Sequence, residues 1–329
     1  MTALAPLLQA FFTDRLCKQR QASPNTVSAY RDSFRLLLGF AQPRLGKVPS
    51  DLLLEELDAP LIGDFLSYLE SDRKNSVRTR NARLAAIHSF FRYIAPREPG
   101  QIELIRRVLA IPQKRFNRNI VCFLDRTEVD ALLTAADSDT WIARRDRTLL
   151  LVAIQTGLRV SELIGLSIGQ IDFGTGAHIK CRGKGRKERC TPLNKQAVKS
   201  LQGWIQERQG ETADPVFPSR RGGPLSRDAI ERLVSKYAVA ATCTCPSLKG
   251  KRVTPHVLRH TTAVELLRAG VDCSVIALWL GHESIETTQI YLHADLSIKE
   301  QALARTDPRA NGTSRYRPDD QLLAFLNEL

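Results

Sequence analysis

Four short motifs in the C-terminal half of the chain carry side chains that could together break a phosphodiester bond. A tyrosine oxygen can attack phosphorus, and arginines can neutralise the charge that builds on the non-bridging oxygens. A lysine or a histidine can give a proton to the departing 5′ oxygen. The residues of these types that the motifs supply are Arg159, Lys184, His256, Arg259, His282 and Tyr291. Together they predict strand cleavage by a protein nucleophile.

Each arginine stands where a helix could aim it at an anion. Arg159 follows Gly157 at an expected helix boundary, and its planar fork can bind two oxygens of one phosphate. The alternative is a surface salt bridge between Arg159 and Glu162, three positions on. Arg259 follows His256 by three positions, so both can reach one phosphate from one helix face, with His256 as proton donor or acceptor. We assign His260 a structural role.

Lys184 lies on a Gly-Lys-Gly turn between two expected strands. The flanking glycines permit a positive φ, and the turn can carry an ammonium group to a leaving oxygen. The neighbouring cations Arg182, Arg186 and Lys187 are expected to contact the DNA backbone. The alternative is a hairpin that only binds phosphate and has no acid role.

His282 and Tyr291 complete the set. His282 follows Gly281, which indicates a helix stop, and from the turn it can donate a hydrogen bond to a non-bridging oxygen. Among the other tyrosines, Tyr30 and Tyr93 lie in apolar helical patterns that are typical of a core. The further competitors for the role of nucleophile are Tyr68, Tyr237 and Tyr316.

The four motifs, in this order and with these local spacings, resemble the tyrosine recombinase family, also called the phage integrase family. They are the segments 156–162, 183–185, 256–260 and 280–282, the last followed nine positions later by Tyr291. The resemblance covers roughly residues 24–304 and implies a 3′-phosphotyrosyl intermediate, a Holliday junction and four protomers on two synapsed sites. It implies that Glu162 supports the catalytic residues, and that neither a cofactor nor a metal takes part.

The elements that must position these residues are mostly helices. Helical periodicity begins at Ser23–Pro24 and recurs through 77–94. Strands are expected at 170–173, 177–181 and 187–193, followed by helices at 195–207, 227–240, 257–269, 274–280 and 287–292. The predicted fold is mostly α with one small antiparallel β-sheet, in a two-domain clamp around DNA. The expected parts are a helical core-binding domain at 1–110, a basic linker at 111–123, a catalytic domain at 124–306 and a tail at 307–329.

Composition agrees with a nucleic-acid partner. The chain of 329 residues carries a formal net charge of +13, which suits double-stranded DNA because cationic contacts release condensed counterions. Its seven scattered cysteines lack the paired spacing of a zinc site and are expected to be reduced thiols. We find neither a secretory leader nor a stretch of membrane-spanning length, and we expect a cytoplasmic protein.

The tail separates this chain from compact members of the family. Leu322, Leu323, Phe325, Leu326 and Leu329 form an apolar stripe after the turn-rich segment 307–314. The stripe could dock on a neighbouring protomer or on its own domain, and the longer tail favours a mobile-element recombinase, acting alone or with related recombinases. Two alternative functions are a type IB topoisomerase, which relaxes supercoils, and an accessory DNA-binding protein without cleavage activity.

Overall fold

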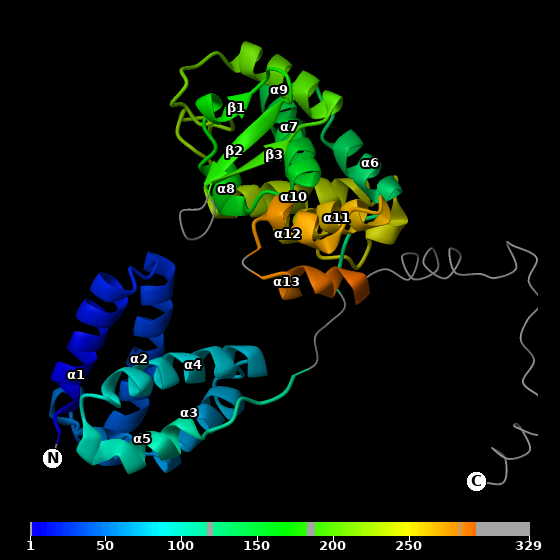
Figure 1. Cartoon of the computed structure of the whole chain (residues 1–329). Helices are drawn as coiled ribbons and strands as arrows, with labels where there is room; N and C mark the ends of the chain where they lie inside the picture. Colours follow the sequence, from blue (N-terminus) through cyan, green and yellow to red (C-terminus); the bar gives the residue numbers. More distant parts are fainter. Residues whose placement is uncertain (1, 117–120, 183–187, 283, 294–329) are drawn as a thin grey trace, which may run out of the picture. The chain divides into compact units, whose positions relative to one another are not determined.

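The computed structural model describes residues 2–116, 121–182, 188–282 and 284–293, and only the backbone of residues 182, 292 and 293. Contacts divide the chain into two compact units, Met1–Arg118 and Asn119–Leu329, which we describe separately (Figure 1). Within the described ranges, none of the helices is both long and apolar enough to cross a bilayer. The predicted tail at 307–329 lies outside the described residues.

Unit 1 is helical throughout its described part. Its longest helix begins where the sequence predicts, because Ser23 Oγ accepts a hydrogen bond from the Thr26 amide at 3.2 Å and Pro24 occupies the first turn. Its elements are α1 (Leu4–Ala10), the π-helical η1 (Phe11–Gln19), α2 (Pro24–Leu45), η2 (Pro49–Asp51), η3 (Leu54–Glu56), α3 (Ala59–Ser71), α4 (Val77–Ile94), η4 (Pro99–Gln101) and α5 (Ile102–Leu109).

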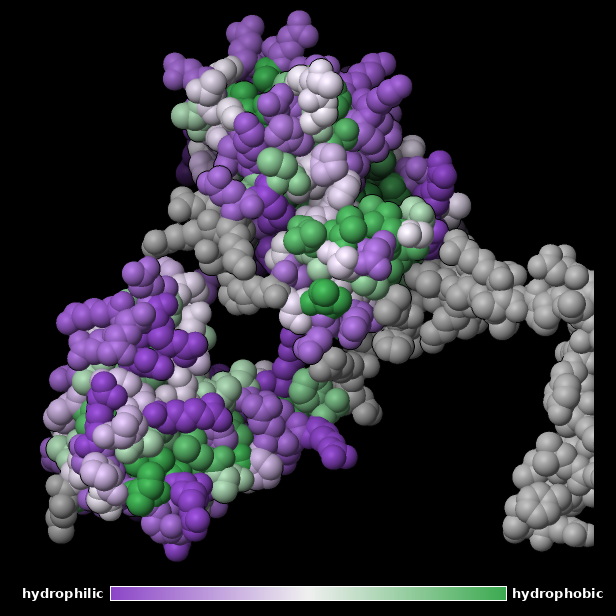
Figure 2. Space-filling model, viewed as in Figure 1, coloured by the Kyte–Doolittle hydropathy of each residue, from purple (hydrophilic) through white to green (hydrophobic). Residues whose placement is uncertain are grey.

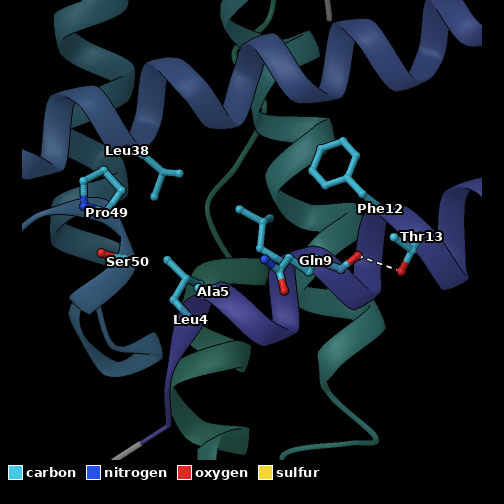
Figure 3. Close-up of a pocket in the computed structure, with 9 residues that line it drawn as sticks. Leu4, Ala5, Gln9, Phe12, Thr13, Leu38, Pro49 and Ser50 are labelled. Carbon is cyan, nitrogen blue, oxygen red and sulfur yellow. Dashed lines mark hydrogen bonds between the residues drawn. The ribbon is translucent and has the colours of Figure 1, made fainter.

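Aromatic rings form the centre of unit 1. The ring of Phe90 packs edge-on against Phe11 and Phe34, with centroids 5.5 and 5.4 Å away. Tyr93 is buried in this core and Tyr30 packs against it, so the prediction that these two tyrosines are core residues is confirmed. An apolar hollow beside α1 and α2 has no ionisable side chain in its lining, so it is not a candidate for chemistry (Figure 3).

Unit 2 combines helices with one small sheet. The three strands are antiparallel in the order β1-β2-β3, and Lys180 pairs with Cys190 across β2 and β3. The predicted fold class, mostly α with a small antiparallel sheet, is confirmed. The elements are α6 (Arg126–Ala135), α7 (Trp141–Thr156), α8 (Val160–Ile164), η5 (Ile168–Gln170), β1 (Ile171–Asp172), β2 (His178–Arg182), β3 (Glu188–Pro192), α9 (Lys195–Arg208), α10 (Arg227–Ala241), η7 (Pro246–Leu248), α11 (Pro255–Arg268), α12 (Cys273–Leu280), α13 (Glu286–Gln289) and η8 (Ile290–His293).

A capping box at the start of α6 helps to position α11. Asp125 Oδ1 accepts from the Glu128 amide at 2.8 Å, and Glu128 Oε2 accepts from the Asp125 amide at 3.0 Å. The carboxylate of Glu128, which is fully buried, also binds Lys251 Nζ at 2.7 Å. Lys251 lies just before α11, so this ion pair fixes the segment that leads into the helix.

Two helices differ from the sequence prediction by more than one residue at a boundary. The helix expected at 257–269 begins earlier, at Pro255, because Thr254 Oγ1 accepts from the Val257 amide at 3.3 Å and a proline suits the first turn. The helix expected at 287–292 is split into the single α-helical turn of α13 and the 3₁₀ turn η8. Tyr291 therefore projects from a 3₁₀ turn and not from a regular helix.

Candidate active site

The candidate site is organised around the C-terminal end of α12. The last carbonyls of a helix have no partner inside it, and they carry its negative dipole end, so they attract cations. Three arginines from three separate parts of unit 2 each donate to one of three consecutive carbonyl oxygens. The pairs are Arg189 Nε with Trp279 at 3.0 Å, Arg259 Nη2 with Leu280 at 2.6 Å, and Arg159 Nη2 with Gly281 at 2.6 Å.

A tight turn at Gly157 positions Arg159 beside the C-terminal end of α12. Gly157 ends α7 with φ of +63°, and a Cβ there would meet Leu280 Cδ2 at 2.6 Å, so a larger residue would need both strain and displacement. Arg159 then caps α8, where its amide donates to Glu162 Oε2 at 2.7 Å and its Nη1 to Oε1 at 3.1 Å. The guanidinium is both salt-bridged and accessible, because 32% of its side chain is exposed.

Arg189 is a functional candidate that sequence reasoning missed. It donates to both oxygens of Glu162, Nη1 to Oε1 at 2.9 Å and Nη2 to Oε2 at 2.8 Å. Burial opposes ionisation of Glu162, but the hydrogen bonds from Arg189 and from the Arg159 amide hold its pKa below the ordinary value. Arg189 lies on β3, opposite the buried Cys181 of β2. The alternation of inward-facing positions along the strand was therefore the signal that could have identified Arg189.

We expect Arg189→Lys to slow DNA strand cleavage by about 10- to 100-fold with little loss of DNA affinity. A lysine keeps the charge but cannot hold both oxygens of Glu162 and the Trp279 carbonyl, so Arg159 would lose its fixed orientation. Single-turnover cleavage of a nicked half-site measures the effect. The matched control is Arg144→Lys, which alters a bidentate pair with Glu207 on the surface. Equal cleavage by both variants would contradict the positioning role of Arg189.

Arg259 is the buried arginine of the site. It projects from α11 with 2% of its surface exposed, and its Nη1 donates to the carbonyl oxygen of Gly157 at 2.7 Å. Burial, followed by the nearby charge of Arg159, lowers the pKa of Arg259 to about 10, so the group remains charged at neutral pH. Arg259 thus ties α11 to the turn that carries Arg159, and the two guanidiniums lie on adjacent carbonyls of α12.

The histidines stand around these arginines. His256 is exposed at the start of α11, and its ring centroid lies 4.3 Å from that of His260. His282 follows Gly281, and its Nδ1 lies 2.8 Å from Thr288 Oγ1. Burial, then the charges of Arg259 and Arg159, lowers the pKa of His282 to about 4. His282 is therefore neutral at neutral pH, and if Thr288 donates to Nδ1, its Nε2–H can donate to an anion.

Tyr291 lies against two of these histidines. Its hydroxyl oxygen is 2.9 Å from His260 Nδ1, and its ring stacks on His282 with centroids 6.3 Å apart. Only 1% of Tyr291 is exposed. Burial raises the pKa of Tyr291, against the opposing effect of Arg259 and Arg159, so the phenol is protonated at neutral pH. His260, assigned only a structural role from its place on the helix, touches the candidate nucleophile.

The structure does not favour the competing tyrosines within its described residues. Tyr237 donates to Asp146 Oδ2 at 3.1 Å, and burial together with this carboxylate raises the pKa of Tyr237 to about 12, which makes it a poor nucleophile. Tyr68 packs against Phe40 in unit 1 with centroids 5.1 Å apart. Tyr316 lies outside the described residues.

Part of the predicted site cannot be placed. Lys184, Arg186 and Lys187 lie outside the described residues, and Arg182 ends β2 with a side chain that is not described. Among the described side chains, His, Cys, Asp and Glu nowhere gather in threes as metal ligands. The residues that the structure does bring together at or beside the end of α12 are Arg159, Glu162, His256, Arg259, His282 and Tyr291.

Family models match both units. The model of the phage integrase family matches residues 122–297, and that of the phage integrase N-terminal SAM-like domain matches residues 10–98. A putative integrase/recombinase, y4rC, of Sinorhizobium fredii is 58% identical over 99% of this chain and 98% of its own length. The tyrosine recombinase XerD of Pseudomonas aeruginosa is 32% identical over 92% of this chain and 98% of its own length.

Solved structures agree on the fold. The integrase of transposon Tn1549, in complex with transposon right end DNA, superposes with a TM-score of 0.69 at 17% identity. The match covers 93% of this chain and 99% of that chain. At this identity the likeness concerns the fold alone, and it extends over both units.

Proposed function

The chain belongs to the phage integrase family and is a site-specific tyrosine recombinase, and we propose that Tyr291 is the residue through which it cleaves and rejoins double-stranded DNA. The observation that carries this proposal is the arrangement at the end of α12. There Arg259 and Arg159 donate to the adjacent carbonyl oxygens of Leu280 and Gly281, and the ring of Tyr291 stacks on His282. We assign unit 1 to DNA core binding and unit 2 to catalysis, joined through the basic segment 111–123.

In the proposed reaction, the phenolic oxygen of Tyr291 forms a bond to phosphorus as the bond from phosphorus to the 5′ oxygen breaks. Arg159 and Arg259 neutralise the charge that grows on the non-bridging oxygens, and His282 donates a hydrogen bond to one of them. The leaving 5′ oxygen takes a proton from Lys184 or His256. The product is a 3′-phosphotyrosyl bond and a free 5′ hydroxyl, which can attack the corresponding bond of a partner strand through a Holliday junction.

DNA must rearrange the site before this attack. Arg159 is the more accessible of the two arginines, so we infer that the scissile phosphate meets it first and replaces the Gly281 carbonyl as its partner. Tyr291 is fully buried, so η8 must shift to expose the phenol to that phosphate. Among the described residues, Arg159 and Arg189 pair with the carboxylate of Glu162 and Arg259 adds a third cation, which leaves positive charge for a phosphate.

We expect the protein to convert a supercoiled plasmid carrying two of its target sites into recombinant products in EDTA and without ATP. The phosphotyrosyl bond keeps the energy of the broken linkage, and the arginines supply the charge stabilisation that Mg²⁺ supplies in many nucleases. The products separate the alternatives on one gel. Relaxation without site preference would indicate topoisomerase activity, and an unchanged plasmid with bound protein would indicate an accessory role. Strict dependence on Mg²⁺ would contradict the proposed chemistry.

We also propose assembly as a homotetramer on two synapsed sites, alone or with related recombinases. Unit 2 exposes an apolar surface at Val275 (47% exposed), Leu278 (75%) and Ile285 (50%), on and just after α12 (Figure 2). The sequence predicts a short amphipathic helix at 321–329, and this segment of a neighbouring protomer is our proposed occupant, because a helix of that length is unstable unless it is docked. We also propose that the protein is a mobile-element recombinase. We expect it to act on DNA in the cytoplasm.

Deleting the tail after Asp307 is expected to spare binding to one half-site but to weaken cooperative binding to a paired site, because it removes the contact between protomers. Gel-shift titrations of the two DNAs measure the difference. The matched variant is Leu278→Ser in the full chain, which alters the apolar surface on which the tail is proposed to dock and keeps the tail itself. It should weaken cooperative binding in the same way. Unchanged cooperativity in both variants, with a loss of monomer thermal stability on truncation, would mean that the tail packs on its own unit.

A further inference from the structure

The hydroxyl of Tyr291 is bonded to a histidine that the motif analysis did not count among the reactive residues. His260 Nδ1 lies 2.9 Å from the phenolic oxygen, a normal hydrogen-bond length. The other two nearby histidines engage other groups: His282 Nδ1 lies 2.8 Å from Thr288 Oγ1, and the ring of His256 packs edge-on against that of His260. A group that takes the phenolic proton must lie within hydrogen-bond reach of that oxygen.

We propose that His260 is the general base that accepts the phenolic proton of Tyr291 as its oxygen attacks phosphorus. The proposal rests on the proposed role of Tyr291 as nucleophile. As the oxygen–phosphorus bond forms, the phenolic proton passes to Nδ1 of His260, and the electron pair of the broken phosphorus–oxygen bond remains on the 5′ oxygen. That oxygen takes a proton from a different group. On religation His260 returns its proton to the tyrosine oxygen.

The surroundings keep the His260 ring in the form that can accept a proton. Burial first, then the positive influence of His256, Arg259 and His282, lowers the pKa of His260 to about 4. Its imidazole is therefore neutral at neutral pH, and in the tautomer protonated on Nε2 it presents a lone pair at Nδ1 to the phenol. An anionic phosphate that enters beside Arg259 would raise the pKa of His260 towards neutrality, where proton transfer is most efficient.

Packing holds the pair together before DNA binds, and the proposed proton transfer requires this hydrogen bond to persist when η8 shifts to expose the phenol. His260 projects from α11, and Tyr291 belongs to an apolar cluster with Ala263, Val264 and Leu280. The two rings meet edge to face with centroids 5.4 Å apart. Since α11 also carries Arg259, the candidate base and one phosphate-binding group are held on the same rigid element, one position apart.

The test is single-turnover cleavage of a nicked half-site by His260→Ala and His260→Gln, measured from pH 6 to 9. We expect both variants to cleave about 10²- to 10³-fold more slowly than wild type at pH 7. The deficit should shrink about tenfold for each unit that pH rises, because hydroxide in solution then ionises the phenol. The matched control is His88→Gln, a buried histidine of unit 1 whose Nε2 lies 3.1 Å from the Val108 carbonyl oxygen.

A second substrate separates base from acid. In a half-site whose bridging 5′ oxygen is replaced by sulfur, the leaving thiolate needs no proton, so loss of a general acid is rescued and loss of the base is not. We expect Lys184→Ala to recover on this DNA while His260→Ala remains slow. Recovery of His260→Ala would overturn the proposal, as would cleavage within about threefold of wild type or a deficit that is the same at every pH. Faster cleavage would also overturn it, because the bond would then restrain Tyr291.

The role of His260 as general base can be wrong while the role of Tyr291 as nucleophile is right, and the experiment separates the two. If wild type forms a covalent adduct that Tyr291→Phe cannot form, while His260→Ala cleaves normally, only the role of His260 is wrong. If wild type forms no covalent adduct with DNA, the function proposed for Tyr291 is wrong.

Discussion

Tyr291→Phe is expected to eliminate covalent attachment of the protein to DNA, a loss of about 10⁴-fold or more in strand cleavage. The variant lacks one oxygen, the proposed nucleophile, and keeps the ring that stacks on His282. It also leaves His260 Nδ1 without its partner, which should lower the free energy of unfolding by only about 1–3 kcal/mol. Half-site binding should therefore be almost unchanged. Denaturing gels of protein incubated with a nicked half-site measure the adduct.

The matched control is Tyr237→Phe. Tyr237 is also buried and also donates its only hydroxyl to one partner, Asp146, but it packs in a different hydrophobic cluster from that of Tyr291 and Leu280. We expect this variant to lose a comparable amount of stability and to keep its cleavage activity. A covalent adduct that persists in Tyr291→Phe and disappears in Tyr237→Phe would reverse the assignment of the nucleophile.

Arg259→Lys is expected to slow cleavage by about 10²- to 10³-fold while the net charge of the protein stays the same. The guanidinium spans the carbonyl oxygens of Gly157 and Leu280 at 2.7 and 2.6 Å, a span that one ammonium group cannot reproduce. The substitution should remove the planar contact to the phosphate and loosen the link between α11 and α12. Single-turnover cleavage at saturating protein separates this effect from weaker DNA binding.

Arg145→Lys is the matched control, because it shows how much stability is lost when a buried arginine outside the candidate site is replaced by lysine. Arg145 is also buried, donates twice to Asp146 and once to the Pro218 carbonyl, and takes no part in the arrangement around α12. Both variants should be less stable in thermal unfolding, but only Arg259→Lys should cleave slowly per folded molecule. Equal cleavage rates for the two variants would show that Arg259 serves folding and not the reaction.

Local signals in the sequence identified part of the fold, whereas α1, η1, α3 and α5 were not predicted as separate helices. Ser23 and Pro24 mark a helix start that depends only on neighbouring residues, and the capping box of Asp125 and Glu128 is equally local. The strand predictions succeeded for the same reason, since glycine-rich stretches of the sequence separate the segments that form β1, β2 and β3. The division of the helix expected at 287–292 was missed, because no proline or glycine marks the change from α13 to η8.

The contacts that organise the candidate site depend on tertiary structure. Arg189 and Glu162 are 27 positions apart, and no local pattern pairs them. The use of the α12 carbonyls as arginine acceptors also joins residues that are far apart in the chain, such as Arg159 and Gly281. His260 was assigned a structural role because it was placed elsewhere on the helical wheel, although a residue four positions after His256 lies on the same helix face and the two ring centroids are 4.3 Å apart. The wheel could not show that η8 returns to α11 and brings Tyr291 to its side.

The most direct measurement is the identity of the bond between protein and DNA. Wild-type protein is trapped on a nicked half-site, the complex is digested with a protease, and the peptide that remains on the DNA is sequenced by mass spectrometry. We expect a single peptide, joined through the phenolic oxygen of Tyr291 to the 3′ phosphate at the break. Attachment through another residue, or to the 5′ phosphate, would contradict the proposed function.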